Sequence, residues 1–415
     1  MAVETLQLKF GTAGEFASEI DAGRLIGRFE APAAISDVAG RVAEALAAPA
    51  DFPPLHQGLA PGDRVTIIVD RRLPSAASVV AGAWREIHKR EIAPEDVTIL
   101  HPADFSGGTP ADPRTGLPED VRDRVQWVLH DPLKTNGCTY LATTAGGERI
   151  YLAREAAEAD ALLLAGCVEF DRLWGYRGLQ SMLYPGLSTI EAIRKAHGQP
   201  HDELQVDDPR PLRQLAEEVA WLLGVQFGVA VLPSEGAGVS RVFAGQADQV
   251  MRSAVSELNR TWRFACASRP ELVLVAVESD AAGQGWDQLA RALHSARNLV
   301  ARDGRIVVLT ELDEALGPGL QMIRDSRKPR DAMRPLRETT PPDLLAATSL
   351  ARSVEWANVY LLSRLDPDLV EELFMVPLSG IDEVARLIQG DERLAVVGSA
   401  QHVCTESAGL EADGA

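Results

Sequence analysis

A glycine-containing stretch that ends in a histidine is the part of this sequence best suited to binding chemistry. Residues 169–197 follow a short apolar run, carry glycines at 175, 178 and 186, and lead into a helical pattern that ends at His197. Glycine lets a backbone approach a ligand closely, the start of a helix favours an anionic group, and a neutral imidazole can hold a metal ion. The stretch predicts a binding loop. The same glycines could serve turn geometry alone, and a helix dipole also favours a histidine at its end.

Further polar residues follow two β-branched runs earlier in the chain. Asp70, Arg71 and Arg72 come at the end of the run 64–70, and His101 ends the run that begins at Val97. Arginine pairs with carboxylates and phosphates, and histidine titrates near neutrality and can serve as an acid or a base. These residues predict contacts to an anionic ligand and a proton-transfer group. The alternative for His101 is a hydrogen-bonded structural residue.

The elements that would position these residues alternate between strand and helix. Apolar runs predict strands at 64–70, 97–100, 161–167, 225–232, 272–277, 305–310, 359–362 and 394–397. Helical spacing predicts helices at 74–90, 188–196, 286–301, 341–355 and 381–389, and Pro/Gly clusters predict long loops at 104–118 and 324–342. This order is typical of an α/β fold with mainly parallel sheets.

Length and composition indicate the number of domains and exclude some classes of partner. A chain of 415 residues predicts two α/β domains with a cleft between them, placed at 1–267 and 268–405, followed by a disordered tail at 406–415. The net charge of −19 argues against a nucleic-acid partner. The sequence shows no apolar run of about 20 residues and no secretory signal, so we expect no membrane segment and a cytoplasmic protein. The four scattered cysteines argue against a zinc site or a disulfide framework.

Several motifs in order resemble the nickel-dependent lactate racemase family. The pair Gly175 and Tyr176, then Gly178, then the pair Pro185 and Gly186 stand in register with that family's signature, which leads into a helix ending in histidine. Residues 70–74 are similar to its aspartate, arginine and proline loop, and 286–291 and 303–306 are similar to later motifs. The resemblance spans roughly residues 5 to 400.

The resemblance implies a cofactor, a nickel-pincer nucleotide, and a reaction that moves a hydride from the carbon of a small 2-hydroxyacid and back. It implies His197 as a nickel ligand, and cofactor contacts from Asp70, Arg71, Arg72, Gly175, Tyr176, Gly178, Ser181, Pro185 and Gly186. The family's tethering lysine falls on Ser181, which implies a cofactor held without a covalent bond. Its catalytic histidines fall on Asp171 and near Ser106, with His101 as a substitute, and its substrate carboxylate contacts fall on Gln288 and Arg291.

Three functions stay open at this point. The first is a divergent 2-hydroxyacid racemase or epimerase. The second is a catalytically inactive homologue, without a cofactor, that binds a nucleotide, a hydroxyacid or a partner subunit, because the lysine and both histidines are absent together. The third is an NAD-dependent dehydrogenase, which has less support because the glycine tract 235–240 fits the dinucleotide motif imperfectly. The substrate and the oligomeric state are left open.

Overall fold

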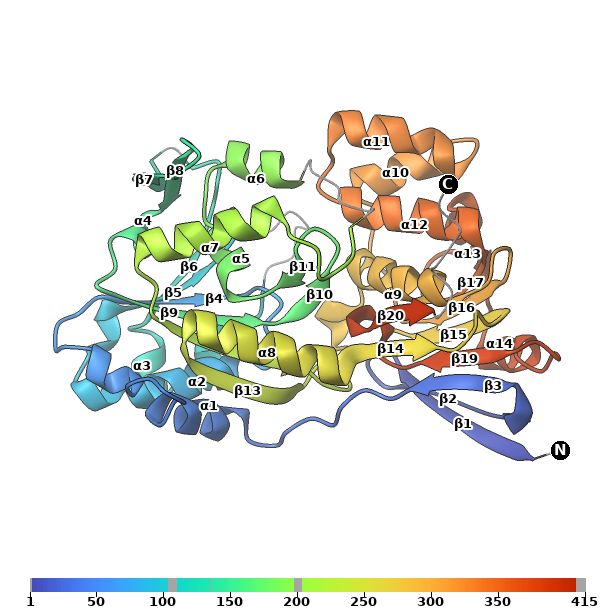
Figure 1. Ribbon diagram of the computed structural model, residues 1–415, viewed down its shortest axis with the longest axis horizontal. Helices are drawn as coiled ribbons and strands as arrows, with labels where there is room; N and C mark the ends of the chain where they lie inside the picture. Colours follow the sequence, from blue (N-terminus) through green and yellow to red (C-terminus); the bar gives the residue numbers. More distant parts are fainter. Residues whose placement is uncertain (1, 104–109, 135, 198–203, 408–415) are drawn as a thin grey trace. The chain divides into compact units, whose positions relative to one another are not determined.

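The structure is a computed structural model that describes residues 2–103, 110–134, 136–197 and 204–407. The chain forms two compact units, each built from more than one segment. Unit N comprises residues 33–234 and 238–259. Unit C comprises, among the described residues, 2–32, 235–237 and 260–407. Figure 1 labels the elements of both units, which are described separately below.

Unit N is built on a mostly parallel sheet with the strand order β13-β12-β9-β4-β5-β6. Its strands are β4 (Val65–Val69), β5 (Val97–His101), β6 (Gln126–Leu129), β9 (Ala161–Cys167), β12 (Phe227–Pro233) and β13 (Val239–Gln246), of which β13 runs antiparallel to β12. Two small antiparallel pairs are added, β7 (Cys138–Thr143) with β8 (Arg149–Ala153), and β10 (Glu169–Asp171) with β11 (Gly175–Arg177). Every residue of β4 and β12 is buried, as expected for parallel strands covered on both faces.

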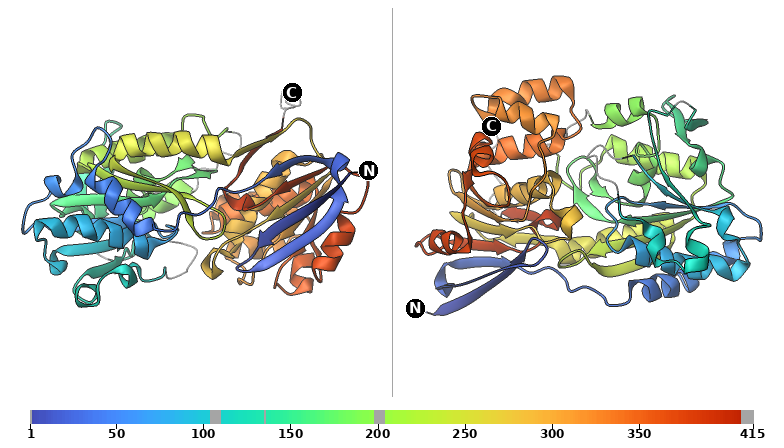
Figure 2. Two further views of the ribbon diagram at one scale, coloured as in Figure 1. Left: turned by 90° about the horizontal axis from the view of Figure 1, so that it is seen from below. Right: turned by 180° about the vertical axis from the view of Figure 1, so that it is seen from behind.

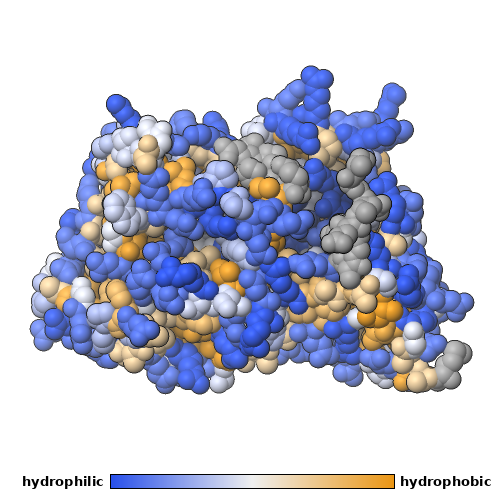
Figure 3. All heavy atoms as spheres, in the orientation of Figure 1, coloured by the Kyte–Doolittle hydropathy of each residue, from blue (hydrophilic) through white to orange (hydrophobic). Residues whose placement is uncertain are grey.

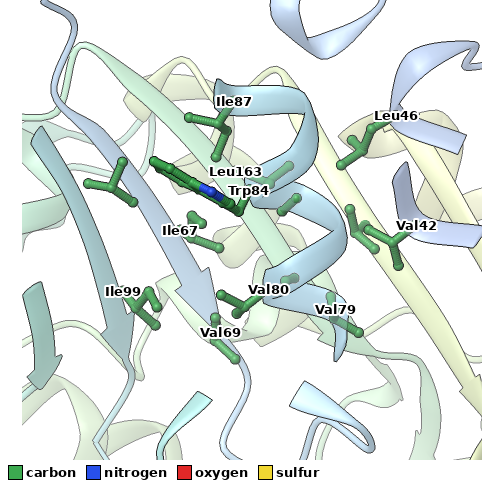
Figure 4. Close-up of a cluster of buried hydrophobic side chains, with 14 of the residues drawn as sticks. Val42, Leu46, Ile67, Val69, Val79, Val80, Trp84, Ile87, Ile99 and Leu163 are labelled. Atoms are coloured by element: carbon green, nitrogen blue, oxygen red, sulfur yellow. The ribbon is translucent and has the colours of Figure 1, made fainter. Parts of the chain in front are cut away.

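Helices cover both faces of this sheet (Figure 1). They are α1 (Val38–Ala47), α2 (Ala76–Ile87), α3 (Glu119–Arg122), α4 (Arg154–Ala157), α5 (Leu179–Leu183), α6 (Ile190–His197), α7 (Pro211–Leu223) and α8 (Ala247–Trp262), the last of which continues into unit C. Figure 4 shows how Val80, Trp84 and Ile87 of α2 pack on Ile67 and Ile99 of the strands. Each such buried apolar side chain contributes roughly 1.5–3 kcal/mol to folding.

Unit C is built on a parallel sheet with the strand order β18-β17-β16-β15-β19-β3. The strands are β3 (Leu25–Phe29), β15 (Leu272–Ala276), β16 (Arg305–Leu309), β17 (Asn358–Leu362), β18 (Val376–Pro377) and β19 (Leu394–Val397). A second pair of strands is β14 (Arg263–Cys266) with β20 (Cys404–Ser407). The hairpin of β1 (Val3–Phe10) and β2 (Gly14–Asp21) lies along one face of the sheet (Figure 2), and its apolar side chains join the core there.

The helices of unit C lie on both sides of its sheet (Figure 1). They are α9 (Trp286–Leu299), α10 (Pro318–Arg324), α11 (Met333–Thr339), α12 (Leu344–Trp356), α13 (Pro367–Glu372) and α14 (Ile381–Leu387). Helices α9 and α12 pack against each other, and α14 lies on the face that the β1–β2 hairpin covers. The α/β class with mainly parallel sheets is confirmed.

The division of the chain differs from the expected boundary at 267/268. Residues 2–32 belong to unit C, because β3 pairs with β19 and the β1–β2 hairpin supplies part of that unit's core. Residues 406 and 407, expected in a disordered tail, end β20, and 408–415 lie outside the described residues. The expected loop at 324–342 contains α11, whose Pro335 stands in the first turn, where proline is tolerated. The cleft between the domains stays a prediction.

Hydrophilic side chains dominate the face of the molecule drawn in Figure 3. This agrees with a chain in which 24% of the residues are charged. None of the helices in the described part of the chain combines the length and the apolar content needed to span a bilayer.

Candidate functional site

The carboxyl edge of the unit N sheet gathers most of the polar residues singled out above. Asp70 follows β4, His101 ends β5, and Glu169 lies just past β9. The ends of these strands are neighbours because β9, β4 and β5 pair in parallel. Ligands of open α/β sheets bind at this edge. The topology therefore places an acid, a histidine and a second acid where a ligand site is expected.

Arg177 is a buried cation shared by two buried carboxylates. Its Nη2 contacts Asp70 Oδ2, and its Nη1 lies 3.3 Å from Glu169 Oε2. The exposed fractions of the side chains are 13% for Arg177, 4% for Asp70 and 6% for Glu169. Burial alone would lower the pKa of Arg177, but the two carboxylates outweigh it and raise that pKa, so the guanidinium stays charged. The cluster joins the loop after β4 to the β10–β11 hairpin.

The β10–β11 hairpin explains why these groups meet. Glu169 pairs directly with Arg177, and Asp171 with Gly175, in the antiparallel register. Asp171 Oδ1 accepts hydrogen bonds from the backbone N–H groups of Leu173 and Trp174, at 2.8 and 3.1 Å. The carboxylate of Asp171 therefore holds the turn of the hairpin, which is a structural task for a residue expected to be catalytic.

The glycines of this stretch are required by packing and backbone conformation. Gly175 has a φ of +70°, and a Cβ there would lie 2.3 Å from the carbonyl oxygen of Val206. A Cβ on Gly178 would lie 2.5 Å from Met251 Sδ of α8. Tyr176 is buried, and its hydroxyl contacts Asp207 and lies 2.9 Å from Asn259 Oδ1. The loop is thus anchored to α8 and to the segment before α7.

Ser181, which replaces the expected tethering lysine, is bonded within its own helix. Its hydroxyl donates to the carbonyl oxygen of Gly178 at 2.7 Å and accepts from the N–H of Gly178 at 3.1 Å. A hydroxyl cannot form the thioamide that the amine of a lysine forms. How a ligand would be held at this helix stays a prediction.

The loops after β4, β5 and α5 are joined by hydrogen bonds. Arg71 Nε donates to the carbonyl oxygen of Pro102 at 2.8 Å, and the N–H of Ala103 donates to the carbonyl oxygen of Gly186 at 2.8 Å. Gly186 follows Pro185, whose peptide bond with Tyr184 is cis. The backbone N–H of Arg72 donates to Asp70 Oδ1 at 3.0 Å, and the Arg72 side chain is exposed. The structure thus brings Asp70, Arg71, Arg72 and the 185–186 pair to one edge.

His101 is the most unusual group at this edge. The residue is 1% exposed, and its Nδ1 and Nε2 have no hydrogen-bond partner among the described residues. The imidazole stands edge-on to the Trp127 ring, with 6.3 Å between the ring centroids. Burial lowers the pKa of His101 to about 4, opposed in part by the nearby backbone of Val69 and supported by the charge of Arg71. The ring is therefore neutral at physiological pH, and both of its nitrogens are buried.

Four further expected residues remain. His197 is the half-buried last residue of α6, and the segment 198–203 that follows lies outside the described residues. Gln288 and Arg291 belong to the first turns of α9 in unit C, where Arg291 Nε lies 3.3 Å from Asp287 Oδ2. Ser106 lies outside the described residues. Roles for these residues in binding stay predictions.

Glu169 and Arg177 are the site residues that sequence reasoning missed. An acid and an arginine eight residues apart across a turn are the signal that could have found them, once 169–177 is read as a hairpin. Among the described residues, no three His, Cys, Asp or Glu side chains lie together as a candidate metal site.

Comparison with known proteins gives consistent results. Residues 12–205 match the family model described as the lactate racemase N-terminal domain. A lactate racemase from Thermoanaerobacterium thermosaccharolyticum is 21% identical over 364 residues, which cover 82% of this chain and 84% of that protein. The solved structure of the lactate racemase apoprotein from that organism matches with a TM-score of 0.80 and 20% identity, covering 97% of this chain and 100% of that chain. A Thermotoga maritima protein structure matches with a TM-score of 0.66 and 14% identity, covering 90% and 99%. These structural matches show the fold.

Proposed function

This chain belongs to the lactate racemase family, and from that premise we propose that it is a racemase or epimerase of a small 2-hydroxyacid. Its cofactor would be a nickel-pincer nucleotide held without a covalent bond. With its net charge of −19, the chain would act on this small molecule in the cytoplasm rather than on nucleic acid or a membrane.

The observation that carries the proposal is the state of His101. A buried polar atom without a partner normally costs about 1–3 kcal/mol, and His101 has two such atoms at the ligand edge of the sheet. That cost is offset if a bound ligand supplies the missing partners. A neutral imidazole at this place can accept the proton of a substrate hydroxyl, which supports His101 as the substitute for the family's histidines.

Asp171 is the weaker of the two acid or base candidates. Its Oδ1 accepts two backbone hydrogen bonds, so taking up a proton would weaken the turn that those bonds hold. His101 has no such task among the described residues. We therefore assign the proton at the substrate hydroxyl to His101, and the stability of the hairpin to Asp171.

The residues of unit N fit a non-covalently bound nucleotide. Arg71 and Arg72 follow Asp70 at the sheet edge and suit a phosphate group, and His197 would be a nickel ligand. When bound, the cofactor supplies reversible hydride transfer at the α-carbon of the substrate. Gln288 and Arg291 of α9 would bind the substrate carboxylate.

The test is to express the protein together with the enzymes that make the cofactor, then to measure nickel by elemental analysis and the chain by intact mass. We expect stoichiometric nickel after gentle desalting and an unmodified chain mass, because Ser181 cannot form a thioamide. Chiral chromatography should show interconversion of 2-hydroxyacid enantiomers. His101→Gln should lower that rate by roughly 100-fold or more. A preparation with neither nickel nor cofactor would refute the proposal.

A second candidate is a non-catalytic homologue that binds a nucleotide, a hydroxyacid or a partner subunit. The observation in its favour is that Ser181 and Asp171 serve the local fold, while Arg177 occupies the space between Asp70 and Glu169. Binding of a hydroxyacid by calorimetry, without racemisation by the nickel-loaded protein, would favour this candidate over the first.

A further inference from the structure

Unit C contains a cavity of about 380 Å³ whose lining is mainly basic. Its walls are Arg302, Lys328, Pro329, Arg330 and Glu355. These residues come from the turn after α9, the segment that leads into α11, and the last turn of α12. The volume lies within the usual range for pockets that bind small molecules. Three cations thus face one carboxylate in a chain whose overall charge is strongly negative.

Two of these cations lack the partners that neighbouring cations have. Within the described residues, Lys328 and Arg330 form no ion pair. By contrast, Arg324 of α10 pairs with Glu372 at 2.6 Å, and Arg334 of α11 pairs with Glu338 at 2.8 Å. The positive charge of the cavity wall is therefore not neutralised within this part of the chain. An anion entering the cavity would meet two cations that are ready to pair.

Arg302 is positioned by an aromatic ring. Its guanidinium lies 5.0 Å from the centre of the Trp356 ring, and its Nε lies 3.8 Å from Asp303 Oδ1. Arg269 lies on the same ring at 5.5 Å, but its Nη1 donates to two carbonyl oxygens at the end of α9, so a structural role accounts for it. Stacking on Trp356 restricts the motion of Arg302 and leaves N–H groups of its planar guanidinium to donate hydrogen bonds to a ligand.

A further arginine lies one turn earlier in α12. Arg352 stands one turn before Trp356 and faces Arg297 of α9 closely enough to repel it. Burial, and then the charge of Arg352, lower the pKa of Arg297 to about 10.

A larger cavity of unit C provides a contrast. It has a volume of about 780 Å³ and lies beside α14. Its lining includes Arg305 and Arg386 but also three acids, and Arg305 contacts Glu392. Positive charge is outnumbered there. The smaller cavity therefore differs from the larger one in its charge and not only in its size, because two of its cations form no ion pair within the described residues.

We propose that this cavity binds the phosphate group of a small phosphate monoester, with Lys328, Arg330 and Arg302 as its ligands. A dianionic phosphate suits one ammonium and two guanidinium groups, because guanidinium forks pair with its oxygens bidentately. Glu355 would repel a second anionic group but can accept a hydrogen bond from a hydroxyl, which favours a sugar phosphate or a nucleoside monophosphate. This site is separate from the residues proposed for racemisation, and it stands whether or not that function holds.

Isothermal titration calorimetry of the full chain, in about 0.1 M salt, tests the proposal. The probes are inorganic phosphate, ribose phosphate, adenosine monophosphate and unphosphorylated ribose. We expect the phosphorylated probes to bind with Kd values below about 1 mM, and ribose not to bind. The difference between ribose phosphate and adenosine monophosphate tells whether the base contributes. Failure of every phosphorylated probe to bind would overturn the proposal.

A matched pair of double variants separates specific binding from general attraction. Lys328→Gln with Arg330→Gln removes two cavity charges, whereas Arg324→Gln with Arg334→Gln removes two charges from neighbouring helices. The first pair should weaken phosphate binding roughly tenfold or more, and the second by less than about twofold. Equal weakening by both pairs would overturn the proposal. If the double variant of Lys328 and Arg330 fails to fold, Arg330→Lys is the alternative, because it keeps the positive charge and removes the bidentate guanidinium. Unchanged phosphate affinity in that variant would overturn the proposal as well.

Discussion

The guanidinium of Arg177 is paired with the carboxylate of Asp70, although 107 residues separate them in the sequence. Replacing Arg177 by methionine would leave Asp70 and Glu169 buried without their shared cation. Removing one partner of a buried ion pair typically costs about 3–5 kcal/mol. We expect a loss of that size in the free energy of unfolding, measured by denaturant titration at neutral pH.

The exposed pair of Arg124 and Glu95 provides the control for Arg177. Its nitrogen and oxygen lie 2.6 Å apart, and both side chains are more than half exposed. Arg124→Met should cost far less than Arg177→Met, because solvent screens an exposed pair. Similar losses in the two variants would show that the burial of the Arg177 cluster has no energetic consequence.

His101 should make the protein sensitive to mild acid. Its pKa is near 6.5 in an unfolded chain and about 4 in the folded protein, so between these values the unfolded state binds the proton more readily. Stability is therefore lost as the pH falls from about 6.5 towards 4. Between pH 7.5 and pH 5 this contributes a loss of about 2 kcal/mol.

The variant His101→Leu should remove that loss. Because neither ring nitrogen has a partner among the described residues, leucine should leave the stability at pH 7.5 unchanged or raise it. Between pH 7.5 and pH 5, the free energy of unfolding of the wild type should fall by about 2 kcal/mol more than that of the variant. Parallel losses in both proteins would mean that His101 titrates normally.

Gly175 and Gly224 form a matched pair for testing the loop. Their φ angles are +70° and +75°, but a Cβ on Gly175 would meet the carbonyl oxygen of Val206 at 2.3 Å, whereas a Cβ on Gly224 would have no other atom within 4 Å. Gly224→Ala should cost about 1 kcal/mol through backbone strain alone. Gly175→Ala should cost at least about 2 kcal/mol more, since the clash adds to the strain. Thermal unfolding of the two variants measures both losses of stability, and equal losses would contradict the prediction.

Restoring a lysine at position 181 tests how a cofactor would be held. If the nickel-pincer nucleotide reaches this helix, Ser181→Lys coexpressed with the cofactor-making enzymes should gain the mass of the cofactor, whereas the wild type should not. Ser181→Met is the control, because it matches the length of lysine without an amine. Both variants lose the hydrogen bonds to Gly178 and should be destabilised by about 1 kcal/mol. An unmodified Ser181→Lys chain would argue against cofactor binding in this loop.

The sequence predicts some elements well because their signals are local. The buried runs of β4, β9 and β15 and the helical pattern of α9 appear within a residue or two of their expected bounds. The placement of residues 2–32 in unit C could not be predicted in this way, since it depends on the pairing of β3 with β19. The long helix α8 was missed although its buried side chains, among them Val250, Ala254 and Leu258, recur every four residues.

The candidate site shows the same limit. Glycine and proline positions carry a local signature, so the loop at 175–186 was expected. The ion pair of Arg177 with Asp70 joins a hairpin to a distant strand end, and a single sequence gives no sign of such a pair. The turn-holding role of Asp171 likewise emerges only from the position of two backbone N–H groups.

The pairing of β3 with β19 has a consequence for how the protein is made. On the ribosome the N-terminal strands emerge first, but the neighbour of β3 lies at 394–397 and is synthesised almost last. Unit N, whose segments lie within 33–259, can complete its sheet while the chain is still growing. The β1–β2 hairpin and β3 must wait with their apolar side chains uncovered until unit C is finished, and this is the interval in which a chaperone would be of most use.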